Sequence, residues 1–179
     1  MHMLILVERD APSYSTWPSL IQKKKISGLS VEEVVNKYQG FEGELVCFFE
    51  IKGNASEFKK KLDECLRMTN LGSCFLLHVI SSPSEMPAFL KDQVIKLGYD
   101  VGICEEEATL YSSIFHEIIF GYFDELVAYK DILNKNLLFP DRATAEKYVD
   151  LHNELSAQGK GVEDYMKMII YEVWKHEAK

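Results

Sequence analysis

The chain has 179 residues, of which 47% are hydrophobic and 27% charged, and its formal net charge is −8. This composition is typical of one globular domain, and it excludes low-complexity disorder, collagen-like repeats and a membrane span of about 20 apolar residues. The acidic excess also argues against nucleic acid and anionic membranes as partners, because both are bound mainly through Lys and Arg.

Residues 1–107 show strands alternating with helices. Short aliphatic and aromatic runs predict strands at Leu4–Glu8, Glu44–Lys52, Ser73–Ile80 and Tyr99–Cys104. Capping residues and apolar spacing predict helices at residues 30–38, 54–70 and 85–97, the last ended by Gly98. Residues 9–29 resist assignment. Since strands alternating with helices are typical of βαβ units, we expect an α/β fold with a small, mostly parallel sheet of about four strands.

Residues 108–179 are predicted to form a helical extension of about three helices, packed on the sheet domain as one compact unit. The helices are expected at residues 108–130, 141–158 and 162–176. The first is apolar around nearly its whole circumference, so it must be covered on most sides. This helix is covered either by the rest of the chain or by a second copy of the protein in a homodimer. For a homodimer the candidate interface residues are Phe115, Ile119, Phe120, Tyr122 and Phe123.

The four cysteines indicate a reducing compartment. Cys47, Cys65, Cys74 and Cys104 include no C-x-x-C pair, and each lies among apolar residues, as thiols that act as small hydrophobes do. The first ten residues have neither a basic region nor a small-residue cleavage site, so we expect no signal peptide. The predicted location is therefore the cytoplasm.

Polar side chains are expected at the carboxyl ends of the strands, where open parallel sheets bind ligands. Four of them are candidate catalytic residues: Glu50, His78, Ser81 and Glu105. Four are candidate ligands of a hard cation such as Mg²⁺: Asp10, Glu105, Glu106 and Glu107. Both sets could instead have a purely structural role, because serines cap helices and acidic residues stabilise helix N-termini. The strand-to-helix turns lack a phosphate-binding glycine pattern, so no cofactor is expected.

Two further patterns are incomplete. His116-Glu117 begins like the helical metalloprotease motif, but Phe120 occupies the position of the second histidine ligand. His152 is isolated in the sequence apart from Glu154. The basic runs Lys23–Lys25 and Lys59–Lys61 are interpreted as solvated surface.

The charge is even along the chain, because residues 1–107 carry 12 basic and 16 acidic side chains and residues 108–179 carry 8 and 12. An acidic surface without a complete catalytic set predicts a non-catalytic cytoplasmic protein that binds another, basic protein. Such a protein would neutralise or regulate its partner, by analogy with antitoxin and immunity proteins. The alternatives are a cation-dependent or acid–base hydrolase that uses the acidic strand ends, and a small-molecule sensor with an apolar pocket.

Overall fold

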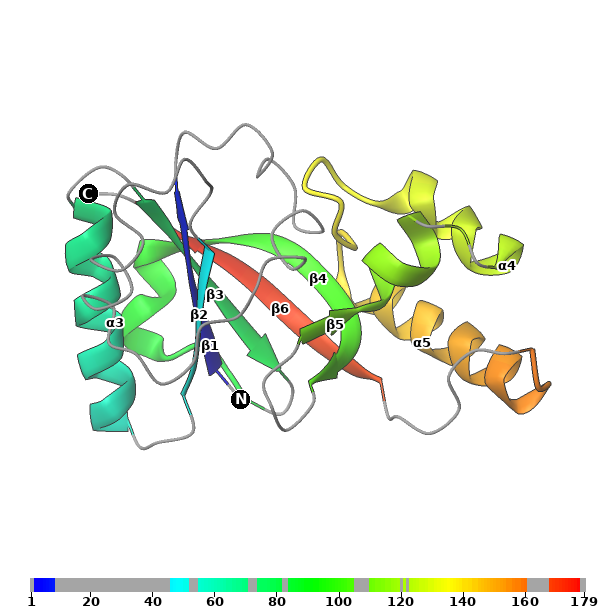
Figure 1. The fold of residues 1–179 in the computed structure, drawn as a ribbon, viewed down its shortest axis with the longest axis horizontal. Coiled ribbons are helices and arrows are strands. Elements are labelled where there is room, and N and C mark those ends of the chain that lie inside the picture. The colour runs from blue at the N-terminus through cyan, green and yellow to red at the C-terminus, as the bar shows by residue number, and fades with distance from the viewer. Residues whose placement is uncertain are drawn as a thin grey trace.

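The computed structural model describes residues 2–8, 46–51, 55–70, 74–81, 84–104, 110–119, 121, 123–160 and 168–177. It has a six-stranded sheet with helices on both faces (Figure 1). The strands are β1 (His2–Glu8), β2 (Val46–Ile51), β3 (Cys74–Ser81), β4 (Val94–Cys104), β5 (Leu110–Ser112) and β6 (Ile169–His176). The strands expected at residues 4–8, 44–52, 73–80 and 99–104 are confirmed within these bounds, whereas the helix expected at residues 30–38 lies outside the described residues.

The prediction of a mostly parallel sheet is wrong. The strand order is β2-β1-β3-β6-β4-β5, and every pairing in it is antiparallel. Strands β2, β3 and β4, which succeed one another with helices between them, do run in the same direction. However, β1 lies between β2 and β3, and β6 lies between β3 and β4. Two strands from the ends of the chain therefore turn the expected βαβ units into split units, in which no parallel neighbours remain.

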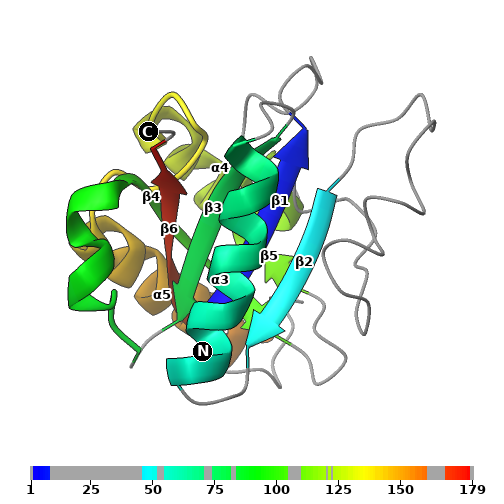
Figure 2. The same cartoon turned by 90° about the vertical axis from the view of Figure 1, so that its left-hand side faces the viewer.

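One face of the sheet is covered by α3 (Ala55–Asn70) and by the 3₁₀ helix η1 (Ala88–Gln93) (Figure 2). Residues Leu4 and Leu6 of β1 pack there against Phe58 and Leu62 of α3. The predicted helix at residues 54–70 is thus confirmed. Its lysines behave as solvated surface, since Lys59 and Lys60 are exposed and Lys61 pairs with Glu64.

The opposite face is covered by the π-helix η2 (Ile114–Ile119), α4 (Asp124–Val127), the 3₁₀ helix η3 (Ala128–Ile132) and α5 (Arg142–Ala157). Residues Met3, Ile5 and Val7 of β1 contribute to this second core. The helix expected from Asp141 is confirmed, because the Asp141 carboxylate caps α5 by accepting a 2.8 Å hydrogen bond from the Thr144 amide. The alternation of β1 side chains between two apolar cores explains why residues 3–7 are all apolar.

Three predicted helices are corrected. The helix at residues 85–97 is reduced to η1, and β4 begins at Val94. The continuous helix at residues 108–130 is instead β5 followed by the short helices η2, α4 and η3, with Gly121 at a positive φ of 75° between η2 and α4. The helix at residues 162–176 is contradicted from Ile169 onward, because β6 is a strand. Of the three helices expected in residues 108–179, that at residues 141–158 is confirmed as α5, whereas β5 and β6 belong to the sheet.

The loop after η3 protects the outer edge of β4. Tyr99 and Phe139 exchange two backbone hydrogen bonds of 2.9 Å, and Asn134 Nδ2 donates to the Leu97 carbonyl at 2.7 Å. Gly98, expected to end a helix, lies at a register shift in β4 with a φ of +150°. A Cβ atom there would lie 2.7 Å from both Leu138 Cβ and the Phe139 carbonyl oxygen. The close approach of this loop therefore depends on glycine.

Candidate functional site

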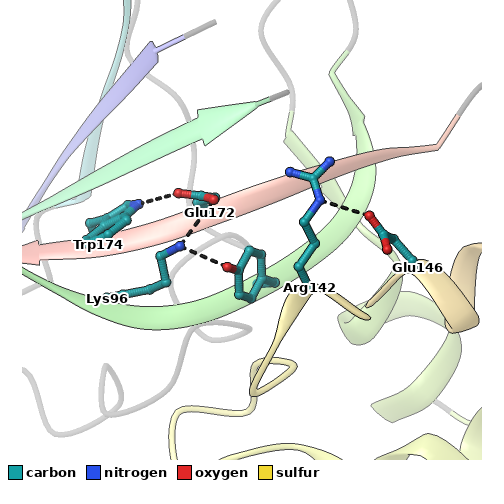
Figure 3. A network of polar contacts seen from close by, with 6 residues as sticks. Lys96, Arg142, Glu146, Glu172 and Trp174 are labelled. Atoms are coloured by element: carbon teal, nitrogen blue, oxygen red, sulfur yellow. Dashed lines mark hydrogen bonds and ion pairs between the residues drawn. The ribbon is translucent and has the colours of Figure 1, made fainter. Parts of the chain in front are cut away.

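Three side chains on β4 and β6 gather around the ammonium group of Lys96 (Figure 3). Together with Lys96 they form what we call the Lys96 cluster: Lys96, Tyr99, Glu172 and Trp174. The strand register pairs Lys96 with Trp174 and Tyr99 with Glu172. Residues three apart in a regular strand point to opposite faces. The register shift between Lys96 and Gly98 allows the Lys96 and Tyr99 side chains to meet.

The ammonium of Lys96 contacts the three other side chains. Lys96 Nζ lies 3.1 Å from Glu172 Oε1 and donates to the Tyr99 hydroxyl at 2.9 Å. It also lies 4.6 Å from the centroid of the Tyr99 ring and 4.4 Å from that of Trp174, within the range of cation–π attraction. Trp174 Nε1 donates to the second carboxylate oxygen of Glu172 at 3.0 Å. The Lys96 and Glu172 side chains remain 30% and 25% exposed, so the cluster is open to solvent.

An ion pair on α5 borders the Lys96 cluster. Arg142 Nε lies 2.9 Å from Glu146 Oε1, and both side chains are about half exposed (Figure 3). The hydrogen bond to Glu146 raises the pKa of Arg142, and the charges of Glu146 and Glu172 act in the same direction. Figure 3 shows Arg142 between Glu172 and Glu146.

A second polar group, the Glu117 cluster, is buried between η2 and α5. Its members are Ser113, Glu117, Tyr148 and His152. Glu117 Oε2 accepts from Ser113 Oγ and, at 2.8 Å, from the Tyr148 hydroxyl. Glu117 Oε1 lies 3.0 Å from His152 Nε2, which is the donor because a carboxylate only accepts. Burial alone would raise the pKa of Glu117, but the hydrogen bonds from His152, Ser113 and Tyr148 together lower it.

The Glu117 cluster is arranged for anchoring. Burial, and the charge of Glu117, raise the pKa of the Tyr148 hydroxyl, so it stays protonated and donates to the carboxylate. The Ser113 hydroxyl donates to the Glu117 carboxylate and lies within hydrogen-bond distance of the Tyr148 hydroxyl. A serine nucleophile would instead be activated by a bond to a base such as His152, which Ser113 does not make. The cluster joins η2 to α5 across 35 residues of sequence.

Three histidines form a third group beneath α3, which we call the histidine cluster: His2, His78 and His176. His2 Nδ1 lies 3.0 Å from His78 Nε2, and the Phe58 ring of α3 lies 5.2 and 5.3 Å from the two imidazoles. The His78 and His176 rings are stacked 6.0 Å apart. Burial, followed by the charges of His2 and His176, lowers the pKa of His78 to about 3, and burial lowers that of His176 to about 4. No group of three or more His, Cys, Asp or Glu side chains within the described ranges could hold a metal ion.

The structure does not bring the described catalytic candidates together. His78 is fully buried, and Ser81 is buried three residues further along β3, where strand alternation places it on the opposite face. The backbone of Glu50 pairs with Met3 in the sheet, but its side chain lies outside the described residues. Residues Asp10, Glu105, Glu106 and Glu107 also lie outside them.

The interface candidates are only partly described. Ile119 and Phe123 are half-buried and pack against the core shared by η2, α4 and α5. The side chain of Phe115, and residues Phe120 and Tyr122, lie outside the described part of the chain. The homodimer remains a prediction. The apolar pocket of a sensor also remains a prediction. A shallow depression along α3 is lined by these side chains: Ser56, Lys59, Lys60, Asp63, Glu64 and Arg67.

The Lys96 cluster and most of the Glu117 cluster are not predicted by the sequence patterns. Glu117 and His152 were noted only as parts of incomplete motifs, and no local signal joins residues 35 apart. For the Lys96 cluster the only sequence signal was the β-branched and aromatic composition of residues 169–174, because apolar and polar residues do not alternate there.

No known protein family, curated protein or solved structure matches this chain. Of the helices in the described segments, none combines the length and the apolar character that crossing a membrane requires.

Proposed function

We propose that this protein is a non-catalytic binding protein that recognises a basic protein partner through the Lys96 cluster. The observation that carries the proposal is the convergence of Trp174, Tyr99 and Glu172 at a solvent-accessible position on β4 and β6. The bound partner would be neutralised or regulated, in the manner of antitoxin and immunity proteins. The cysteine pattern favours the reducing cytoplasm as the place where this occurs.

The chemistry of the cluster suits protein recognition. Trp, Tyr and Arg dominate the binding energy of protein interfaces, because they bury large areas and keep a polar group for orientation. Here Trp174 and Tyr99 are held by contacts to Glu172 and Lys96, and Arg142 lies at the border. Side chains that are ordered before binding lose less conformational entropy on association.

The net charge supports a basic partner. A surface with a charge of −8 attracts positively charged proteins over several ångströms and raises their association rate at low ionic strength. At the cluster itself the charges balance, because Glu172 pairs with Lys96 and Glu146 pairs with Arg142, so the attraction comes from the net charge of the whole chain.

The test compares capture of native proteins by the wild-type chain and by three variants. Trp174→Leu removes the aromatic centre of the cluster, and Glu146→Arg reverses a half-exposed charge at its border. Glu154→Arg is the matched control, since Glu154 is exposed on the same helix two turns away. The proteins captured are then purified, and their affinities are measured by calorimetry.

We expect the wild-type chain and Glu154→Arg to bind the same basic protein, and the other two variants to bind it at least about tenfold more weakly. A partner that is acidic, or that binds Trp174→Leu and Glu146→Arg as tightly as the wild type, would overturn the proposal. Circular dichroism establishes that each variant is folded.

A further inference from the structure

We infer that Tyr99, Glu172 and Trp174 form a binding site for a Lys or Arg side chain, and that Lys96 fills this site in the free protein. We call these three residues the cation cage. The inference rests on the proposed function and specifies the chemistry of recognition: the basic partner inserts a cationic side chain and displaces the Lys96 ammonium.

The composition of the cation cage matches an ammonium or guanidinium group. Such groups are recognised by aromatic ring faces within about 6 Å, with a carboxylate to complete the charge. Lys96 Nζ meets this description from the Trp174 ring, at 4.4 Å, and from Glu172 Oε1 at 3.1 Å, while the Tyr99 hydroxyl accepts from it at 2.9 Å. An anionic ligand would meet the Glu172 carboxylate and the negative faces of both rings, so the cage selects cations.

Trp174 and Glu172 are held by a contact that does not involve Lys96, whereas the Tyr99 side chain is independent of Lys96 only in its backbone, since its hydroxyl accepts from the Lys96 ammonium. Trp174 Nε1 donates to Glu172 Oε2, which orients the carboxylate and leaves Oε1 for a cation. The backbone of Tyr99 is fixed by two hydrogen bonds to Phe139. Withdrawal of Lys96 therefore leaves a site that is already arranged for another cation.

Lys96 is suited to leave the cage. Its side chain is 30% exposed, so the ammonium reaches water by rotation of its four-carbon stem. An intramolecular group of this kind competes like a free ligand at millimolar concentration. A single free cation thus displaces Lys96 poorly, whereas a partner that makes further contacts with Arg142 and Glu146 at the border displaces it readily.

The experiment opens the cage with Lys96→Met, which keeps most of the apolar stem and removes the ammonium. The probe is Nα-acetyl-lysine amide, and the uncharged control ligand is Nα-acetyl-norleucine amide. Binding is followed by the NMR signal of the Trp174 indole N–H, in a Trp17→Phe background so that one tryptophan remains. Lys91→Met, on the exposed side of η1, is the matched control variant.

For Lys96→Met we expect saturable, millimolar binding of the lysine probe and none of the norleucine probe. The wild type and Lys91→Met should bind the lysine probe about two- to fivefold more weakly, because Lys96 competes for the cage, and the double variant Lys96→Met/Glu172→Gln should bind it at least about tenfold more weakly. The inference is overturned if Lys96→Met shows no saturable shift, or if Glu172→Gln makes no difference in that background. Thermal unfolding curves confirm that each variant is folded.

The two proposals fail separately. If Trp174→Leu abolishes partner binding but Lys96→Met does not bind the probe, the partner uses this surface without the cage. If Lys96→Met binds the probe but Trp174→Leu leaves partner binding unchanged, the cage exists and the proposed function is wrong.

Discussion

Glu117 is a carboxylate buried with 5% of its surface exposed, and three donors hold it in the ionised form. Hydrogen bonds to a charged group contribute more than neutral ones, and loss of one partner leaves the others unsatisfied. We expect Glu117→Gln to lower the free energy of unfolding by about 2–4 kcal/mol in urea titrations, because the amide loses the charge and its NH2 group opposes either the His152 donor or the Tyr148 and Ser113 hydroxyls. The exposed Glu154→Gln on α5 should change it by less than about 0.5 kcal/mol. A Glu117→Gln protein as stable as the wild type would show that the cluster contributes no anchoring.

Gly98 is the residue on which the close contact between β4 and the loop at residues 134–139 depends. Its φ of +150° disfavours side chains, and an added Cβ would come within 2.7 Å of Leu138 and Phe139. We expect Gly98→Ala to cost about 2–4 kcal/mol of unfolding free energy, from backbone strain and overpacking together. Gly159→Ala is the control, since its φ is also positive but no atom lies within 4 Å, so only the strain of about 1 kcal/mol applies. Equal costs at the two positions would contradict the close contact.

At the scale of elements, α3 is attached to the sheet partly through the histidine cluster, and this attachment depends on pH. Burial lowers the folded-state pKa of His78 to about 3 and of His176 to about 4, from 6.5 in the unfolded chain. Below pH 6.5 the unfolded chain therefore takes up protons first, so stability falls between about pH 6.5 and pH 4. The groups that face His78 are His2 from β1, His176 from β6 and the uncharged Phe58 from α3.

The test is the slope of unfolding free energy against pH. Each buried histidine contributes up to about 1.4 kcal/mol per pH unit in this window. We expect His78→Phe to make the slope between pH 6 and pH 4.5 shallower by about that amount, whereas above pH 7.5 the slope should match the wild type. If the slopes coincide below pH 6, His78 is not the group that titrates on unfolding.

The elements also show how far local pattern determines structure. Helices α3 and α5 are predicted correctly because cap residues and apolar spacing agree, as at Asp141, whose carboxylate caps α5. The β6 segment was mistaken for a helix because Ile169, Ile170 and Val173 also fit helical spacing. Its β-branched and aromatic residues favour a strand. The periodicity of a segment does not show which other segments it pairs with. β6 pairs with β3 and β4, which lie some 70 residues or more away in the sequence.

The same limit applies to the candidate site. Lys96 and Trp174 are 78 residues apart, and only the β4–β6 register joins them. The polar residues predicted at the carboxyl ends of parallel strands depended on a parallel sheet, and the antiparallel pairing removed that common edge. A site formed by two strands that are far apart in the sequence can therefore be predicted only when the strand order is known.

At the scale of the whole molecule, the charge of −8 predicts that duplex DNA is repelled. We expect no binding of a labelled DNA duplex in fluorescence anisotropy at about 150 mM salt, because binding needs several Lys or Arg contacts to phosphates. At about 20 mM salt the repulsion is screened less, so the result should be the same. Tight binding that weakens as salt rises would contradict the assignment of a basic protein partner.

Strand order also decides which part of the chain folds alone. Residues 1–107 include β1 to β4, but the β6 strand between β3 and β4 and the α5 side chains of one core, such as Tyr148, come from later in the sequence. Without β6, the inner edges of β3 and β4 lose their hydrogen-bond partner, and Met3, Ile5 and Val7 lose their cover. We therefore expect a fragment of residues 1–107 to show no cooperative thermal unfolding and poor dispersion in NMR spectra. Addition of residues 108–179 as a separate chain should restore both properties. Cooperative unfolding of the fragment by itself would mean that β1, β2 and β3 form a stable sheet with α3 and do not require β6.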